Sequence, residues 1–327
     1  NLSPVDVQKR SNSLELAIAI GLLTVTKQIS IDSSYCFLGA LSLDGEIEPV
    51  RHMLPLIHYY DHKDITFVIP KKNITDILPL HNIRYIAIDH LTELSTLATN
   101  KPEIINANNC AFSSIQHEPH GQFDSVNGHF LAKQACAIAI AGRHPLLFVG
   151  SPGIGKTMLI DCMPSLQPPL SAPAIIENLC IQSLVNQPLT YTDIAPFRTP
   201  HHTTSYAGMI GGQNPPKPGE ITRANHGILF LDELGEYNRN ILETLREPLE
   251  TQKIQISRAG NAITFPAHFL LSAAMNPCYC GQLFNDQHAC ICNPAKVSQY
   301  WHKLSQPLID RFSICMILKK PALLNDS

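Results

Sequence analysis

The residues best suited to chemistry form a glycine-rich segment that ends in a lysine and a threonine. They share the spacing G-x-x-x-x-G-K-T and are Gly150, Ser151, Pro152, Gly153, Ile154, Gly155, Lys156 and Thr157. Glycines between a strand and a helix let backbone N–H groups and the positive helix end point at phosphate oxygens. Lys156 suits the β- and γ-phosphates of ATP, and Thr157 suits Mg²⁺. The segment predicts a nucleotide-binding phosphate loop.

An acidic pair and an asparagine supply further groups for hydrolysis. Asp232 follows an apolar run and suits the Mg²⁺ shell, while the neighbouring Glu233 suits a general base that polarises the attacking water. Asn276 follows another apolar run, and its amide can orient water or contact the γ-phosphate. An asparagine before a proline indicates only a turn by itself, so this interpretation depends on the other two motifs.

Short apolar runs precede all three motifs, at residues 145–149, 227–231 and 269–274. Such runs are typical of buried parallel strands. Residues 158–163 suit a helix that Pro164 ends. Because ligands of open α/β sheets bind beyond the carboxyl ends of the strands, we expect the three motifs to meet at one sheet edge. The predicted fold class is α/β, with a parallel-sheet core.

The chain divides into two predicted domains, residues 1–98 and 122–327, joined by a linker at 99–121 that is rich in Asn, Ser, Pro and His. The first domain alternates strand-like and helix-like segments. They are a hairpin over 37–50 that turns at Asp44-Gly45, strands at 65–69 and 83–88, and helices at 52–60 and 90–98. We therefore expect a second α/β unit before the nucleotide-binding one.

Composition narrows the functional classes. The chain has 327 residues, enough for two cores, and its net charge of −3 excludes a broad basic field for nucleic acid. We expect no signal peptide, and the sequence has no apolar run long enough to span a bilayer. Ten cysteines beside a nucleotide motif indicate reduced thiols in the cytoplasm. A start at Asn1 rather than Met indicates a fragment.

Four cysteines form a second group of candidate functional residues. They are arranged as two C-x-C pairs: Cys278 and Cys280, and Cys290 and Cys292. Four thiols within fifteen residues could form a tetrahedral Zn²⁺ site, although C-x-C is tighter than the usual C-x₂-C. Reduced cytosolic thiols or an adventitious disulfide are the alternatives. The pair His201-His202 could likewise bind a metal or form hydrogen bonds within its loop.

Seven blocks together resemble the YifB/ComM family of magnesium-chelatase-like AAA+ ATPases. They are PFRTPHHT at 196–203, PGEI at 218–221, LFLDEL at 229–234, REPLE at 246–250, ISRA at 256–259, AAMNPC at 273–278 and LIDRF at 308–312. The resemblance covers nearly the whole chain. It implies that residues 1–98 are related to the proteolytic domain of Lon, and that the family's N-terminal start and C-terminal lid lie outside this sequence.

The resemblance implies a hexameric ring with ATP between subunits, and a DNA helicase that promotes branch migration during natural transformation. Lys156, Thr157, Asp232 and Glu233 then carry the nucleotide chemistry, and Asn276 matches the first sensor position. Arg311 matches the finger that reaches a neighbour's γ-phosphate, a role that suits a guanidinium. From the residues alone, an ordinary surface salt bridge is the alternative for Arg311. The absent lid would carry a second sensor arginine, so we expect it to matter for full ATPase competence.

The Lon-like domain departs from the proteolytic pattern. The resemblance places Ser13 near the Lon nucleophile and Leu54 where the catalytic lysine belongs. A serine without a nearby base is a weak nucleophile. We therefore interpret Ser13 as structural and expect no peptidase activity.

Two basic loops are candidates for DNA. The glycine- and proline-rich stretch 199–223 predicts an extended insertion, and residues 253–264 predict a hairpin. Lys217 and Arg223 of the first, with Lys253 and Arg258 of the second, could contact phosphates; solvated loop charges are the alternative.

The leading functional hypothesis is an ATP-driven DNA motor. The others are a magnesium-chelatase motor subunit and a non-catalytic nucleotide-binding fragment. The Lon-like domain favours the first over the second, because chelatase motor subunits lack it.

Overall fold

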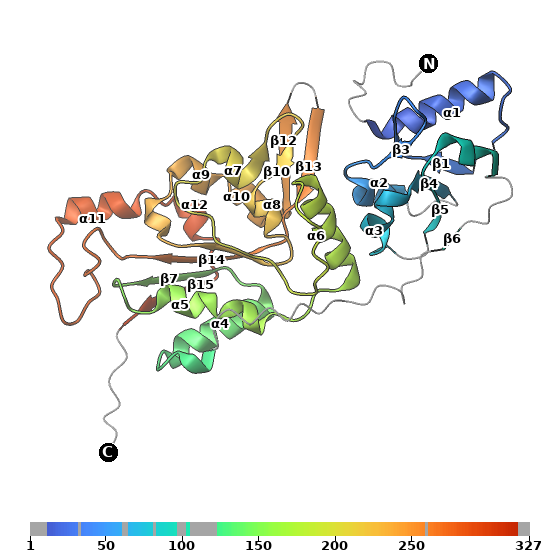
Figure 1. The fold of residues 1–327 in the computed structure, drawn as a ribbon. Helices are drawn as coiled ribbons and strands as arrows, with labels where there is room; N and C mark the ends of the chain where they lie inside the picture. Colours follow the sequence, from blue (N-terminus) through green and yellow to red (C-terminus); the bar gives the residue numbers. More distant parts are fainter. Residues whose placement is uncertain are drawn as a thin grey trace. The chain divides into compact units, whose positions relative to one another are not determined.

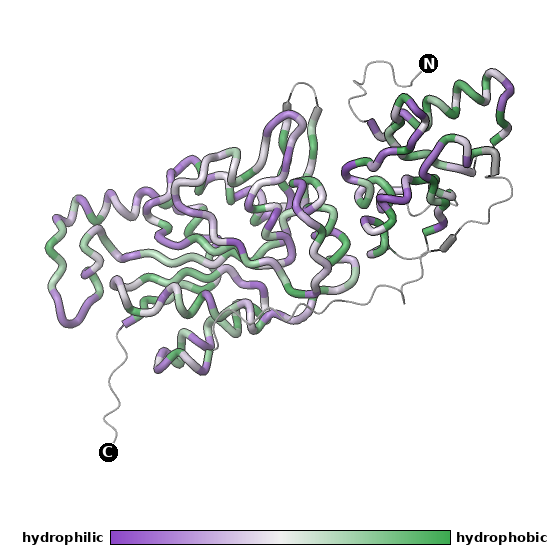
Figure 2. The backbone as a smooth tube through the Cα atoms, viewed as in Figure 1, coloured by the Kyte–Doolittle hydropathy of each residue, from purple (hydrophilic) through white to green (hydrophobic). Residues whose placement is uncertain are grey.

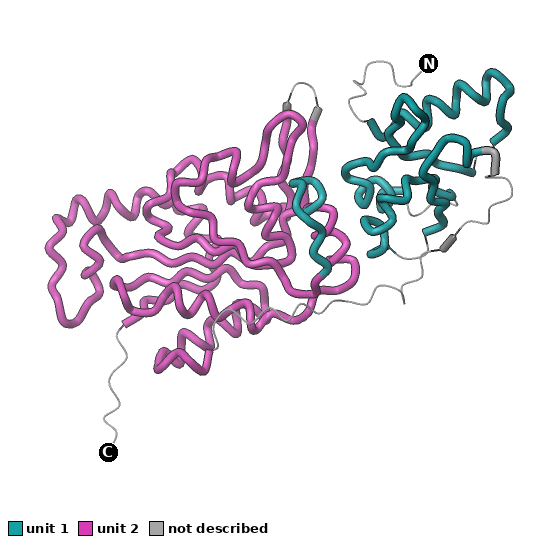
Figure 3. The backbone as a smooth tube through the Cα atoms, in the orientation of Figure 1, with its two compact units in different colours: residues 1–113, 182–191 teal, residues 114–181, 192–327 magenta. Residues whose placement is uncertain are grey.

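The computed structural model describes residues 12–31, 34–60, 65–80, 83–96, 103–104, 123–258 and 261–319. The chain forms two compact units, which Figure 3 shows in different colours. Unit 1 comprises residues 1–113 and 182–191, and unit 2 comprises residues 114–181 and 192–327. None of the helices in the described residues is long and apolar enough to cross a membrane.

A five-stranded sheet forms the core of unit 2, with the order β15-β7-β14-β11-β8. The strands are β7 (Leu146–Gly150), β8 (Phe197–Arg198), β11 (Ile228–Leu231), β14 (Leu270–Met275) and β15 (Ile314–Leu318). Every pairing in this sheet is parallel, which confirms the predicted fold class. β7, β11 and β14 are buried along their whole length, and this burial explains their continuous apolar runs.

Helices cover both faces of this sheet, with α4 and α5 on one side and α7 to α10 on the other (Figure 1). α4 (Phe130–Gly142) and α5 (Lys156–Asp161) pack into one core with the central strands, which Figure 2 shows to be rich in apolar residues. The helix predicted at 158–163 begins earlier, at Lys156. It ends at Asp161, before the 3₁₀ turn η6 (Met163–Leu166).

The remaining elements of unit 2 are short helices and turns around one hairpin. They are η5 (Phe123–Ser125), α6 (Ala172–Leu184), α7 (Tyr206–Ile210), β9 (Gly211–Gly212), β10 (Lys217–Pro218), α8 (Glu220–Arg223), η7 (Leu234–Glu236), α9 (Arg239–Glu243), α10 (Arg246–Thr251), α11 (Pro294–Trp301) and α12 (Gln306–Ile309). The last residues of α6, 182–184, belong to unit 1. The hairpin pairs β12 (Lys253–Arg258) with β13 (Asn261–Pro266), as predicted for residues 253–264.

The stretch 199–223 is not the extended insertion that its glycines and prolines predicted. It folds into α7, α8 and the two-stranded sheet β9–β10. The Ser205 side chain caps α7 by accepting a hydrogen bond from the Gly208 N–H at 3.1 Å. Met209 and Ile221 are buried, so apolar packing overrides the turn-forming composition.

Unit 1 contains a four-stranded sheet with the order β1-β4-β5-β6. Its strands are β1 (Tyr35–Phe37), β4 (Thr66–Pro70), β5 (Arg84–Ile88) and β6 (Glu103–Ile104), and only β6 pairs antiparallel. The short helical elements are η1 (Asn12–Leu14), α1 (Glu15–Val25), α2 (Met53–Tyr60), η2 (Lys71–Asn73), α3 (Ile74–Ile77) and η3 (Leu91–Thr96). The predicted strands at 65–69 and 83–88 and the helix at 52–60 are confirmed.

Three predictions for unit 1 need correction. The strand expected from Phe37 onward is split, because Phe37 ends β1 while β2 (Ala40–Leu41) pairs with β3 (Ile47–Glu48). Where the structure describes the helix expected over 90–98, it is the 3₁₀ segment η3, and residues 97 and 98 lie outside the described residues. The predicted linker contains β6, which pairs with β5; other linker residues lie outside the described part of the chain. The first and third errors arose where strand pairing, rather than local composition, decides the element.

Candidate nucleotide-binding site

The phosphate loop connects β7 to α5 at the carboxyl edge of the sheet. Gly150 is the last residue of β7, and Lys156 is the first residue of α5. Gly155 precedes the helix with a φ of +95°, a left-handed conformation that glycine adopts without strain. The loop therefore brings the N-terminus of α5 to the sheet edge, as its motif predicted.

Lys156 joins the phosphate loop to the neighbouring strand. Its Nζ donates to the carbonyl oxygens of Gly150 at 2.7 Å and Ser151 at 3.0 Å, and to Oδ1 of Asn276 at 3.1 Å. Burial lowers the pKa of Lys156, and the Asp232 carboxylate opposes this effect. All three hydrogen-bond acceptors are neutral, so phosphate oxygens would be stronger partners for this ammonium.

Thr157 and Asp232 form the second part of the site. Thr157 Oγ1 donates to Asp232 Oδ2 at 2.9 Å, and the Glu233 N–H donates to Asp232 Oδ1 at 2.8 Å. A hydroxyl and a carboxylate oxygen are ligands that Mg²⁺ accepts. The pair predicted for Mg²⁺ thus lies together, at the ends of elements that are 75 residues apart in the sequence.

Glu233 has a left-handed backbone, with a φ of +51°, and a side chain that is 58% exposed. Its Oε2 lies 3.3 Å from Nδ1 of His202. His201 hydrogen-bonds to Thr203 Oγ1 at 2.8 Å, which is the loop bonding considered for this histidine pair. The contact between His202 and Glu233 was not foreseen, because no local pattern connects residues 31 positions apart.

A pocket of about 900 Å³ opens beside the phosphate loop. One side is lined by Ser151, Gly153 and Gly155, and another by residues of the stretch 282–288. The sequence motifs identified the first side only. The two C-x-C pairs that bracket the second side were the available signal, but they indicated a metal rather than a pocket wall.

The comparison that decides the family covers unit 2. A family model described as "Magnesium chelatase, subunit ChlI" matches residues 122–323. The chain belongs to the magnesium chelatase subunit ChlI family. A second model of this family, described as "Subunit ChlI of Mg-chelatase", matches residues 1–73.

Curated relatives confirm the assignment of this ChlI-family chain to the YifB/ComM proteins. "Competence protein ComM" of Haemophilus influenzae is 35% identical over 96% of this chain and 63% of that protein. "Uncharacterized protein YifB" of Escherichia coli is 34% identical over 98% of this chain and 63% of that protein. A more distant match, "Probable DNA helicase MCM9" of Arabidopsis thaliana, is 26% identical over 56% of this chain and 24% of that protein. The chain thus spans less than two thirds of the length of its first two relatives.

Arg311 of the ChlI-family chain follows α12 and pairs with Glu250 on α10. Its side chain is 41% exposed. Within one chain, Arg311 therefore forms the surface salt bridge that was considered as the alternative to an arginine finger. A role toward a neighbouring subunit stays a prediction.

The basic residues considered for DNA have different surroundings. Arg223 lies on α8 and pairs with Glu220 at 2.6 Å, and Glu220 also binds Arg198 at 2.7 Å. The positive charge of Arg223 is thus already offset by Glu220. Lys217 begins β10 and is partly exposed, whereas Lys253 begins β12 and is exposed. Arg258 ends β12, but its side chain lies outside the described set.

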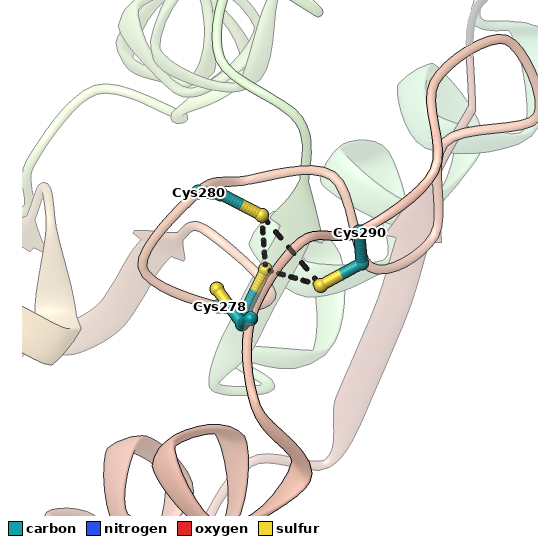
Figure 4. A group of neighbouring side chains, drawn as sticks. Cys278, Cys280 and Cys290 are labelled. Carbon is teal, nitrogen blue, oxygen red and sulfur yellow. Dashed lines mark hydrogen bonds between the residues drawn. The ribbon is translucent and has the colours of Figure 1, made fainter.

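The four cysteines after β14 converge, with all four sulfurs within 4.8 Å of one another (Figure 4). The Cys278 sulfur lies 3.4 Å from Cys280 and 3.6 Å from Cys290. All four are free thiols, so they form no disulfide here. Backbone N–H groups of Gln282 and Ile291 lower the pKa of Cys280 to about 6, which favours its thiolate. Burial and the hydrogen bonds to Cys280 and Cys278 raise the pKa of Cys290 to about 12.

The two positions that the expected resemblance to Lon singled out are both buried in unit 1. Ser13 is 5% exposed within η1, and its carbonyl accepts a hydrogen bond from the Gly39 N–H at 3.1 Å. Leu54 is completely buried in α2. Both side chains are buried, and neither lines the pocket beside the phosphate loop.

Proposed function

We propose that this chain is the ATP-binding and ATP-hydrolysing part of an AAA+ motor that acts on DNA. The observation that carries the proposal is the meeting of four side chains at one sheet edge. They are Lys156, Asn276, Thr157 and Asp232. A cation for phosphates, two oxygen ligands for Mg²⁺ and a sensor amide together form the apparatus for breaking a phosphoanhydride bond.

Each group then has one task in hydrolysis. Lys156 exchanges its carbonyl partners for phosphate oxygens, and the hydroxyl of Thr157 with the carboxylate of Asp232 would hold Mg²⁺. Glu233 accepts a proton from the attacking water. His202, 3.3 Å from Glu233, acts as a positioning residue that limits where this carboxylate points. Asn276 orients the water or the γ-phosphate.

A hexameric ring is the proposed assembly, with ATP between subunits. Arg311 would leave Glu250 and donate to the γ-phosphate of a neighbour, because a guanidinium is well suited to developing phosphoryl charge. Such an exchange is feasible because the Arg311–Glu250 pair is partly exposed, and exposed pairs contribute only about 0–1 kcal/mol.

DNA is the proposed substrate, contacted through its phosphates by the β12–β13 hairpin. Lys253 is exposed there, and six hairpins in a ring would concentrate charge that a chain of net −3 lacks. The relatives named a competence protein and a probable DNA helicase support this choice. Lys217 remains a weaker candidate. Arg223 is the weakest, since Glu220 already neutralises it.

The four converging cysteines are the proposed Zn²⁺ site, and a cytoplasmic location suits their free thiols. A magnesium-chelatase motor subunit is the second candidate function, because the matching family model carries that description.

ATP turnover with and without forked DNA tests the proposal. We expect DNA to raise turnover in the wild type, and the double variant Lys253→Ala/Arg258→Ala to lose this response while it keeps basal turnover. Lys296→Ala, an exposed lysine on α11, is the matched control. Turnover that ignores DNA but responds to a tetrapyrrole and chelatase partners would favour the chelatase function. ATP binding without turnover would indicate a non-catalytic fragment.

A further inference from the structure

The sulfur geometry of the cysteine cluster fits a tetrahedral metal. Zn–S bonds of about 2.3 Å give sulfur–sulfur edges of about 3.8 Å in a regular tetrahedron. The sulfurs of the three cysteines labelled in Figure 4 lie 3.4 to 3.6 Å apart, close to those edges. A disulfide would need a separation of about 2.05 Å between two of them.

The cluster closes a loop that contains residues 281–289. Cys278 and Cys280 stand before this segment, and Cys290 and Cys292 stand after it. The segment contains neither helix nor strand, so few backbone hydrogen bonds hold its shape. A metal that joins both ends would restrict its conformations, as any crosslink that closes a loop does.

One end of this loop lies directly against the phosphate loop. A Cβ atom added to Gly281 would lie 2.5 Å from Cδ and 2.8 Å from Cγ of Pro152, and the φ of Gly281 is +73°. Glycine suits position 281 for two reasons: the backbone has a positive φ, and Pro152 leaves no room for a side chain. Movement of the cysteine cluster would be transmitted to the phosphate loop through this contact.

The same loop lines the pocket beside the phosphate loop. Gln282, Asn285 and His288 contribute to its wall. Their amides and imidazole can exchange hydrogen bonds with the edge of a purine or with ribose hydroxyls. Asp286 pairs with Lys319 after β15 at 3.1 Å, which ties the middle of the loop to the sheet.

We infer that Zn²⁺ bound by the four cysteines holds residues 281–289 as a wall of the nucleotide pocket, so that zinc and nucleotide bind cooperatively. This inference rests on the proposed nucleotide binding. Because coupling between two sites is reciprocal, zinc must raise nucleotide affinity by the same factor by which nucleotide raises zinc affinity.

The test uses the whole chain, a non-hydrolysable ATP analogue with Mg²⁺, and calorimetry beside elemental analysis. We expect about one Zn²⁺ per chain, and at least a tenfold loss of analogue affinity after zinc removal. Cys280→Ser/Cys292→Ser should lose both zinc and affinity. Cys315→Ser, an exposed cysteine outside the cluster, should keep both. The analogue should slow zinc release to a chelator.

Gly281→Ala separates the two sites. It should keep zinc but lose nucleotide affinity, because the added methyl pushes the loop away from Pro152. Gly21→Ala is the matched control, since nothing lies within 4 Å of the added atom there. Absence of zinc, or equal analogue affinity with and without zinc, would overturn the inference while the proposed nucleotide binding and hydrolysis stand. Absence of zinc would also remove the proposed Zn²⁺ site. A zinc-loaded chain that binds no analogue would reject both.

Discussion

Both units place a lysine near the carboxyl edge of a sheet, yet the two lysines have opposite surroundings. Lys71, after β4, pairs with Asp89 at 3.0 Å and Glu93 at 3.6 Å, and its hydrogen bond to Asp89 raises its pKa. Lys156 is buried among neutral oxygens, and burial lowers its pKa. A lysine already neutralised by carboxylates offers little to a phosphate, whereas Lys156 gains a charged partner when one arrives.

The comparison teaches that a shared architecture does not imply a shared function. β4 in unit 1 and β7 in unit 2 are both buried along their whole length, and polar residues follow the end of each strand. The residues that follow the strands make the difference. In unit 2 they leave a cation, an acid and an amide available to a ligand, while in unit 1 they pair with one another on the surface.

Glu233→Gln should produce the largest effect. The amide keeps the size of the side chain but cannot accept a proton from water, so turnover should fall about 10²- to 10⁴-fold while ATP binding persists. Glu236→Gln, an exposed acid on η7, is the control. Steady-state ATPase assays and calorimetry measure both properties. Wild-type turnover in Glu233→Gln would place the base elsewhere.

Leu54→Ala tests whether Leu54 in unit 1 has only a structural role. Its side chain is completely buried, so truncation should cost about 2–5 kcal/mol of unfolding free energy in unit 1. ATP affinity should not change. Leu43→Ala, a fully exposed leucine in the same unit, should alter neither property. A loss of ATP affinity in Leu54→Ala, measured by calorimetry beside denaturant unfolding, would contradict the functional separation of the two units.

Lys156→Ala should remove most of the affinity for ATP–Mg²⁺. The loss of a charge-assisted contact to phosphate corresponds to about 2–3 kcal/mol or more, hence at least a 30- to 160-fold higher Kd. Isothermal calorimetry measures it, and Lys71→Ala provides the matched lysine from unit 1, which should leave the Kd unchanged. Equal ATP affinity in Lys156→Ala and the wild type would end the phosphate-loop interpretation.

Ser13→Ala should have the smallest effect, because no peptidase activity is expected from unit 1. The expected resemblance to Lon puts Leu54 at the position of the proteolytic lysine, and Ser13 is buried. Casein cleavage, with and without ATP, should stay at background in wild type and variant alike. Cleavage that ATP stimulates and Ser13→Ala removes would show that the serine is a nucleophile.

Local patterns predicted the strands and motifs better than the loops between them. The runs at 145–149, 227–231 and 269–274 became β7, β11 and β14 within about one residue, because a buried parallel strand must be apolar throughout. The stretch 199–223 was misjudged. Its glycines and prolines suggest an extended chain, but burial of Met209 and Ile221 stabilises short helices instead.

The sequence by itself determined which chemical groups this protein carries and which short elements present them. The spacing from Gly150 to Thr157 requires a tight loop before a helix, and this requirement involves only neighbouring residues. Only the tertiary structure decided which distant groups meet. The strand order β15-β7-β14-β11-β8 brings Asn276 to Lys156, and Asp232 to Thr157. The contact of Gly281 with Pro152 is of the same kind. Such contacts depend on how strands far apart in the sequence pair and pack, which no local pattern encodes.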